Sequence, residues 1–210
     1  MAVTIPLPVD TGPYDGTGPP EDVWTDTALT CNGVDTEALL GTIEAFEERP
    51  SLARFTFRAR NRWLGGAHSR TTIRDFHAAG HDDASRRTDF VVDAGEPSIL
   101  MGTDTGASPA EHLLHALAAS LTTSIVYVAA TRGVHLSEVE SSLEADLDVR
   151  GALGLTGADR RGFRRIRISL RVGGDAPERE LRGIVALARR RSAVLDLVTN
   201  GVRVDVEVQT

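Results

Sequence analysis

The 210-residue chain contains no lysine and only one cysteine, and each shortage excludes a class of chemistry. All 23 basic residues are arginines, so no lysine is available for a Schiff base, a pyridoxal phosphate linkage or a Walker A phosphate loop. The single cysteine, Cys31, excludes an intrachain disulfide and a cysteine-based zinc site. With a net charge of −7, the chain lacks the excess of basic residues that binds nucleic acid, so we expect no DNA or RNA partner.

The length and composition are those of one compact domain that buries a core without disulfides. Residues 1–16 lack a basic stretch followed by an apolar run, so we predict no secretory signal and expect a cytoplasmic protein. Residues 1–34 are rich in proline and glycine and predict an N-terminal arm. The folded domain is then expected to span residues 35–210.

The longest apolar segment runs from Leu113 to Thr131 without a formal charge, which is the length of a membrane span. Polar side chains interrupt it, however, and lipid would leave them unsatisfied. These residues are His115, Ser120, Thr122, Thr123 and Ser124. We therefore interpret the segment as the buried helix of a soluble protein and expect no membrane partner.

Local signals predict where this helix begins and ends. Ser108 precedes Pro109 and is followed three residues later by Glu111, which is the pattern of a capping box with proline at the first helical position. Gly133 fits a C-terminal cap.

The remaining patterns alternate between strands and helices. Asp35 predicts the cap of a helix over residues 35–49 that Pro50 ends. Strands are predicted at 52–62, 70–80, 88–94, 136–151, 163–174 and 202–208, with a second helix at 177–192. The first three strands suggest an antiparallel meander. Three strands, a helix, two strands, a helix and a strand predict an α+β fold.

Polar groups on the long helix admit three interpretations. Glu111 and His115 lie one turn apart and can act as a coupled proton donor and acceptor. They can equally be a plain pair near the start of a core helix whose hydroxyls bond to backbone carbonyls. Glu111, His112 and His115 also resemble a helical metal site, but no third ligand segment is evident, so we predict no metal.

Four segments along the chain form a recognisable series of motifs. They are Asn-Gly-Val at 32–34, Arg-Trp-x-Gly-Gly at 62–66, EPSILMGTDTGASPAEHLLHAL at 96–117 and ARRRSAVLDLVTNGVRV at 188–204. In this order they resemble the OsmC/Ohr superfamily of thiol-dependent peroxidases. The resemblance covers residues 30–210. It implies an OsmC-like fold with curved antiparallel sheets around a long buried central helix. It also implies an intertwined homodimer with two pockets at the subunit interface.

The departures from this family concern its chemistry. The positions of the family's reactive and resolving cysteines match Ser120 and Ser192. A serine hydroxyl has no sulfenic acid chemistry, so the conventional peroxidase turnover should be missing. The family also uses an arginine and a carboxylate, for which the resemblance suggests Arg70, with Arg60 behind it, and Glu111.

We therefore predict a cofactor-independent protein whose interface pocket binds an apolar small molecule and transforms it by isomerisation, dehydration, cyclisation or hydrolysis. The predicted catalytic residues are Ser120, Glu111, His115, Ser192 and Arg70, and the predicted substrate-binding residues are His112, Thr123, Ser124, Arg60 and Tyr127. Three alternatives stay open.

The first alternative is a Ser120 nucleophile, which needs a histidine from another segment, such as His68 or His81, because neither helical histidine faces it. The second is a non-catalytic relative of organic hydroperoxide reductases that binds hydrophobic ligands. The third is that Cys31 is a relocated reactive thiol.

Overall fold

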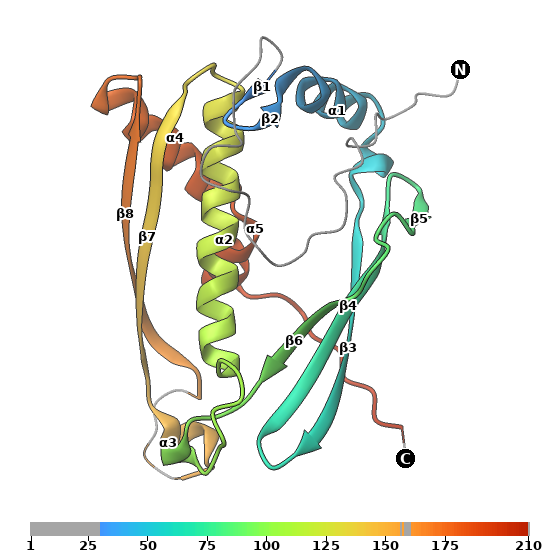
Figure 1. The fold of residues 1–210 in the computed structure, drawn as a ribbon, viewed down its shortest axis with the longest axis vertical. Helices are drawn as coiled ribbons and strands as arrows, with labels where there is room; N and C mark the ends of the chain where they lie inside the picture. The colour runs from blue at the N-terminus through green and yellow to red at the C-terminus, as the bar shows by residue number, and fades with distance from the viewer. Residues whose placement is uncertain (1–29, 156, 158–160, 210) are drawn as a thin grey trace. The chain divides into compact units, whose positions relative to one another are not determined.

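The computed structural model describes residues 30–155, 157 and 161–209. Residues 1–29 of the predicted arm lie outside these described residues. The chain divides into two compact units, one ending at Leu113 and the other beginning at Leu114. Figure 1 shows the elements of each unit.

The first unit holds one α-helix, two 3-10 turns and six strands within its described residues. They are β1 (Thr30–Cys31), β2 (Val34–Asp35), α1 (Thr36–Glu48), η1 (Pro50–Ala53), β3 (Thr56–Gly65), β4 (His68–Ala78), β5 (His81–Asp83), β6 (Phe90–Ala94) and η2 (Ser98–Leu100). The predicted helix cap is confirmed, because the Asp35 carboxylate accepts a 2.8 Å hydrogen bond from the Ala38 N–H. Pro50 opens η1 and delays the first long strand, so β3 begins at Thr56 instead of the predicted residue 52.

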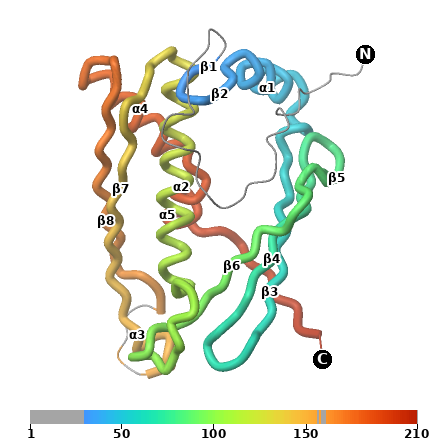
Figure 2. The backbone as a smooth tube through the Cα atoms, viewed as in Figure 1, coloured from blue at the N-terminus to red at the C-terminus, as the bar shows by residue number. Residues whose placement is uncertain are grey.

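Strand β4 is the centre of the main sheet in this unit. It pairs antiparallel with β3 along one edge and with β5 and β6 along the other, and Figure 2 shows β6 lying along β4. Arg60 lies opposite Thr72, Arg62 opposite Arg70, and Arg70 opposite Asp93. Directly opposed residues of an antiparallel pair project to the same side, so these five residues share one face of the sheet.

Helix α2 (Pro109–Ala130) is the predicted central helix, and it begins as the capping box requires. The N–H and hydroxyl of Ser108 donate to Glu111 Oε2 at 2.7 and 2.8 Å, and the Glu111 N–H donates to Ser108 Oγ at 3.3 Å. Among the described residues, α2 is also the one helix long and apolar enough to cross a membrane, a test that core helices pass as well. Its C-terminal half contributes fully buried core residues such as Ile125.

The second unit packs helices against a long antiparallel ribbon. Its further elements are β7 (Leu136–Leu147), α3 (Val149–Ala152), β8 (Phe163–Gly174), α4 (Glu178–Arg191) and α5 (Ala193–Asn200). Strands β7 and β8 pair along their whole lengths, as Figure 1 shows. The buried core joins α2 to α4 and comprises Ile125, Val128, Ala129, Val134, Ile184 and Ala188, with apolar residues of β7 and β8 packed against it.

The α+β class and the antiparallel sheets are confirmed, but four local predictions are wrong. The strand predicted at 136–151 ends at Leu147, and residues 149–152 form the helix α3. Residues 81–83, expected in a turn, form the short strand β5. A separate helix, α5, follows the predicted second helix. Residues 202–208 form no strand, although their valines alternate with charged residues. An alternating segment becomes a strand only when a sheet edge supplies backbone partners, and the described chain supplies none here.

Candidate functional site

The structure brings together the two serines that the sequence aligned with the family's cysteines. Ser120 Oγ lies 2.9 Å from Ser192 Oγ, although 72 residues separate them in the chain. Ser120 projects from α2, and Ser192 joins α4 to α5. Ser192 is only 2% exposed, and Ser120 is half-buried. The prediction that these two positions form one site therefore has a matching geometry.

Both hydroxyls face the first turn of α5. Ser192 is the N-cap of this helix, and its Oγ accepts a 3.3 Å hydrogen bond from the Leu195 N–H. Ser120 Oγ accepts a longer bond of 3.5 Å from the Val194 N–H. The pair thus lies where helix N–H groups favour negative charge, a setting that lowers the pKa of thiols placed there.

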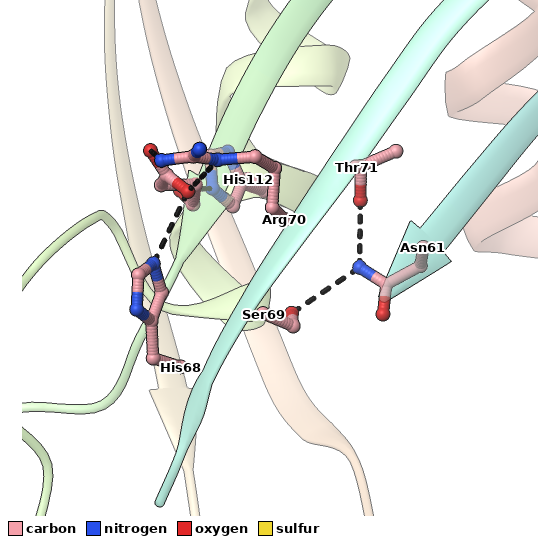
Figure 3. Close-up of polar contacts among 7 residues, drawn as sticks. Asn61, His68, Ser69, Arg70, Thr71 and His112 are labelled. Carbon is pink, nitrogen blue, oxygen red and sulfur yellow. Dashed lines mark hydrogen bonds and ion pairs between the residues drawn. The ribbon is translucent and has the colours of Figure 1, made fainter. Parts of the chain in front are cut away.

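A second polar cluster in the first unit is organised by Asp93 of β6. Arg70 of β4 donates from Nε and Nη2 to the two oxygens of the Asp93 carboxylate at 2.8 and 3.0 Å. His68 Nε2 lies 3.1 Å from Asp93 Oδ1, and His112 Nε2 lies 3.1 Å from the Asp93 carbonyl oxygen. Figure 3 shows His68, Arg70 and His112 converging on this position. We call these four residues the Asp93 cluster.

These contacts fix the ionisation of Asp93 and the donor nitrogen of each histidine. Hydrogen bonds from Arg70, and then from His68, lower the pKa of Asp93 to about 2, so its carboxylate is ionised at neutral pH. An ionised carboxylate and a carbonyl can only accept hydrogen bonds, so His68 and His112 each donate from Nε2. In the neutral imidazoles the lone pair therefore lies on Nδ1. A histidine oriented in this way by a carboxylate is arranged to act as a general base.

The opposite face of β4 carries neutral polar groups. Asn61 of β3 donates from Nδ2 to Thr71 Oγ1 at 2.8 Å and to Ser69 Oγ at 3.2 Å. Figure 3 shows these side chains across the strand from His68 and Arg70. The alternation of the strand thus separates the ionisable cluster from a neutral network.

Glu111 and His115 do not form the coupled pair that the sequence suggested. The Glu111 carboxylate is engaged by Ser108, whose backbone N–H and hydroxyl lower its pKa. His115 is exposed and has no hydrogen bond or ion pair within the described part of the chain. Glu111 therefore serves the start of α2, because a carboxylate there satisfies N–H groups that have no partner within the helix.

The remaining predicted residues are spread over several surfaces. On α2, Thr123 and Tyr127 are exposed and Ser124 is half-buried. Arg60 lies on the face of the sheet that also carries the Asp93 cluster. Cys31 is buried in β1. Within the described residues no three histidine, cysteine, aspartate or glutamate side chains are grouped to hold a metal ion.

Sequence reasoning missed Asp93 and mentioned His68 only as one possible partner for a serine nucleophile. One signal was present, since Asp93 interrupts the otherwise apolar run Phe90–Ala94. A carboxylate in such a strand needs a cation or donor beside it. The register that places Arg70 opposite it is decided by strand pairing and is not visible in the spacing of the residues.

Comparisons with known proteins agree on the family. The sequence profile of the OsmC-like protein family matches residues 102–207. The solved structure of an OsmC-like protein from Mycoplasma pneumoniae matches with a TM-score of 0.52 and 13% identity, over 69% of this chain and 88% of that chain. A protein from Psychrobacter arcticus 273-4, described as an osmotic stress induced and detoxification response protein, matches with a TM-score of 0.51 and 11% identity, over 68% and 88%.

A third structure, an organic hydroperoxide resistance protein OsmC from Legionella pneumophila, matches with a TM-score of 0.47 and 17% identity, over 70% of this chain and 90% of that chain. No curated protein sequence matches significantly. The family profile spans half of the chain and includes both α2 and the Ser120 and Ser192 positions. The first two structures support the same fold. The resemblance inferred from the sequence motifs is confirmed, and the chain belongs to the OsmC-like protein family.

Proposed function

We propose that this OsmC-family protein lacks conventional thiol peroxidase activity and that the region around Ser120 and Ser192 binds an apolar small molecule and transforms it. This proposal rests mainly on the 2.9 Å contact between the hydroxyls of Ser120 and Ser192, at the positions that the resemblance assigns to the redox cysteines. A peroxidatic thiolate attacks a peroxide oxygen and becomes a sulfenic acid, which a second thiol converts to a disulfide. Serine supports neither step.

The surroundings of the serine pair support an apolar ligand. Leu117 and Leu121, close to Ser120 on α2, are buried, so the part of the helix that carries Ser120 has apolar surroundings. Ligand sites of this kind combine an apolar lining with a few polar groups that fix orientation. The two hydroxyls and the N–H groups of Val194 and Leu195 supply such polar groups.

For the chemistry we retain the acid/base classes of isomerisation, dehydration, cyclisation and hydrolysis, without a cofactor. Within the first unit, His68 is the side chain best arranged for proton transfer, since Asp93 orients it and its side chain is 24% exposed. Glu111 is less suited, because its carboxylate already accepts two hydrogen bonds from Ser108.

One observation favours a second candidate, a non-catalytic binding protein for hydrophobic ligands. Among the described residues of the second unit, the Ser120 hydroxyl hydrogen-bonds to Ser192 and to the Val194 N–H, and no histidine of that unit bonds to it. A serine nucleophile requires an adjacent base. Hydrolysis through Ser120 is therefore the least supported of the proposed reactions. We also propose that the protein is a homodimer, as the resemblance implies, and that it works in the cytoplasm.

The test is to restore the sulfurs. Two proteins are compared, both of which carry Cys31→Ser. One keeps Ser120 and Ser192, and the other carries Ser120→Cys/Ser192→Cys. Each is incubated with cumene hydroperoxide and dithiothreitol, and the loss of peroxide is followed. We expect no loss above buffer and dithiol for the serine pair, and a rate increase of at least about 100-fold for the double variant, in line with typical nucleophile effects. Each turnover would yield cumyl alcohol and water and oxidise one dithiol.

The Ser120→Cys variant alone, incubated without dithiothreitol, is the matched control. It should consume about one equivalent of peroxide and stop as the sulfenic acid, whereas the double variant should form a disulfide between its two cysteines. Peroxidase activity in the unaltered protein would contradict the proposal and direct attention to Cys31. Binding is tested separately by calorimetric titration with cumyl alcohol. Ser120→Phe, which fills the region, should abolish the heat of binding while the protein remains folded.

A further inference from the structure

A cavity of about 280 Å³ opens on the face of the β3–β4 sheet that carries Arg60, and its lining includes none of the residues of the Asp93 cluster. It is lined mainly by Arg58, Arg60, Thr72 and Arg74, with Asp75 and Asp89 beside them. Three arginines around one small cavity are unexpected in a chain with a net charge of −7. The volume is near the lower end of the range for small-molecule sites, which begins at roughly 300 Å³.

The charges in this cavity are unevenly compensated. Arg58 pairs with Asp82 at 3.1 Å, and Arg74 lies 3.5 Å from Asp89. Arg74 also lies 3.8 Å from Asp75, so Arg58 and Arg74 are both neutralised by aspartates. The side chain of Arg60, by contrast, is exposed and forms no hydrogen bond or ion pair with any residue in the described ranges. The guanidinium of Arg60 is therefore the group in the lining that is available to a ligand.

Strand register gives Arg60 a neighbour suited to the same ligand. Thr72 lies directly opposite it on β4, and both residues line the cavity. A guanidinium presents a planar fork of N–H donors that matches two oxygens of a carboxylate or phosphate. The threonine hydroxyl adds another donor from the adjacent strand.

We propose that this cavity, which we call the Arg60 cavity, binds the oxyanion of a small molecule. Arg60 donates to two oxygens of the anionic group, and the Thr72 hydroxyl donates to one of them. The shared ligand chemistry is a carboxylate or a phosphate group. The proposal does not rest on the serine pair and fails or stands independently of it.

Arg62 provides a matched control. It follows Arg60 by two residues on β3, projects to the same face and is likewise exposed and without a partner among the described residues, but it does not line the cavity. Diffuse attraction of anions to the arginine-rich face would depend on both residues equally. Binding at a specific site in the cavity would depend on Arg60 and not on Arg62.

The experiment is a titration of the intact protein with benzoate in one arm and inorganic phosphate in the other, followed by calorimetry and by the ¹⁵N–¹H signals of arginine Nε. We expect at least one probe to bind, and the stronger arm identifies the ligand class. Arg60→Gln should weaken binding at least about tenfold, because a charge-assisted hydrogen-bonded pair is lost, whereas Arg62→Gln should change it by less than about twofold. Arg60→Lys should restore only part of the affinity, because lysine keeps the charge but not the fork.

Thermal unfolding of each variant verifies that the sheet is intact, and Thr72→Val provides a second disruption of the cavity without a change of charge. Equal losses in Arg60→Gln and Arg62→Gln would overturn the proposal in favour of diffuse attraction. The absence of binding by either probe at about 10 mM, ten times a millimolar dissociation constant, would also overturn it.

Discussion

At the residue scale, Asp93 shows how one side chain can organise several others. Its carboxylate holds Arg70 in a two-point contact and orients His68, while its backbone carbonyl orients His112. Because each acceptor is fixed, the donor nitrogen of each imidazole is fixed as well. The cluster thus holds each imidazole in one orientation, with Nε2 as the donor and Nδ1 directed away from Asp93.

Replacing Asp93 with asparagine should change the dependence of stability on pH. The pKa of Asp93 lies at about 2 in the folded protein, against an ordinary value near 3.8. A carboxyl whose pKa falls on folding stabilises the protein above its unfolded pKa, and that contribution is lost as the pH falls toward the folded value. Urea unfolding should therefore show Asp93→Asn less stable than the parent at pH 7, with the difference shrinking between about pH 4 and pH 2.

Asp205→Asn is the control for this measurement, because Asp205 is exposed and pairs only with neighbouring Arg203 among the described residues. Its effect on unfolding should be small at every pH. A stability difference for Asp93→Asn that stays constant down to pH 2 would contradict the assigned contacts.

At the element scale, α2 depends on local signals at its start and on packing along its length. The capping box ties Ser108 to Glu111 at the N-terminus, and buried residues such as Ile125 hold the C-terminal half against α4. The first feature is readable in the sequence, since its residues are three positions apart. The second requires α4 and the β7–β8 ribbon to be in place, so spacing alone does not reveal it.

Replacing Ser108 with alanine should destabilise the protein by about 1 kcal/mol, the typical cost of losing a helix cap. The midpoint of urea unfolding should fall without a change in its slope, which shows that the folded state is otherwise preserved. Thr123→Ala, at an exposed position on the same helix, is the control and should leave the midpoint unchanged or raise it slightly, because alanine favours helix. A Ser108→Ala midpoint equal to that of the parent would show that the capping box adds no stability.

At the scale of the whole molecule, apolar side chains remain uncovered in the single chain. Val202, Val204, Val206 and Val208 are 68–83% exposed and alternate with charged residues. An extended segment of this pattern has one apolar face and unpaired backbone groups, both of which pairing with a sheet edge would satisfy. A second copy of the chain would supply such an edge in the homodimer that we propose.

Sedimentation equilibrium should therefore give twice the 22.5 kDa chain mass, and Val204→Asp/Val206→Asp should shift the protein toward the monomer. Charges at these two positions would have to be buried without partners on association, which is unfavourable. Glu207→Gln, on the opposite side of an extended segment, should leave the association unchanged. A parent protein that sediments as a monomer at all concentrations would refute this expectation.

The sequence alone determined the family, the α+β class and the extent of the central helix, because motif order, hydrophobic period and capping residues are local properties. The sequence motifs also matched Ser120 and Ser192 to the positions of the family's two redox cysteines. Tertiary structure decided the rest. Strand register brought Arg70 to Asp93 and Arg60 to Thr72, and the lack of a sheet edge kept residues 202–208 from forming a strand. Strand pairing between segments that are distant in the chain does not appear in the hydrophobic pattern of either segment. Only the folded structure reveals which residues are paired.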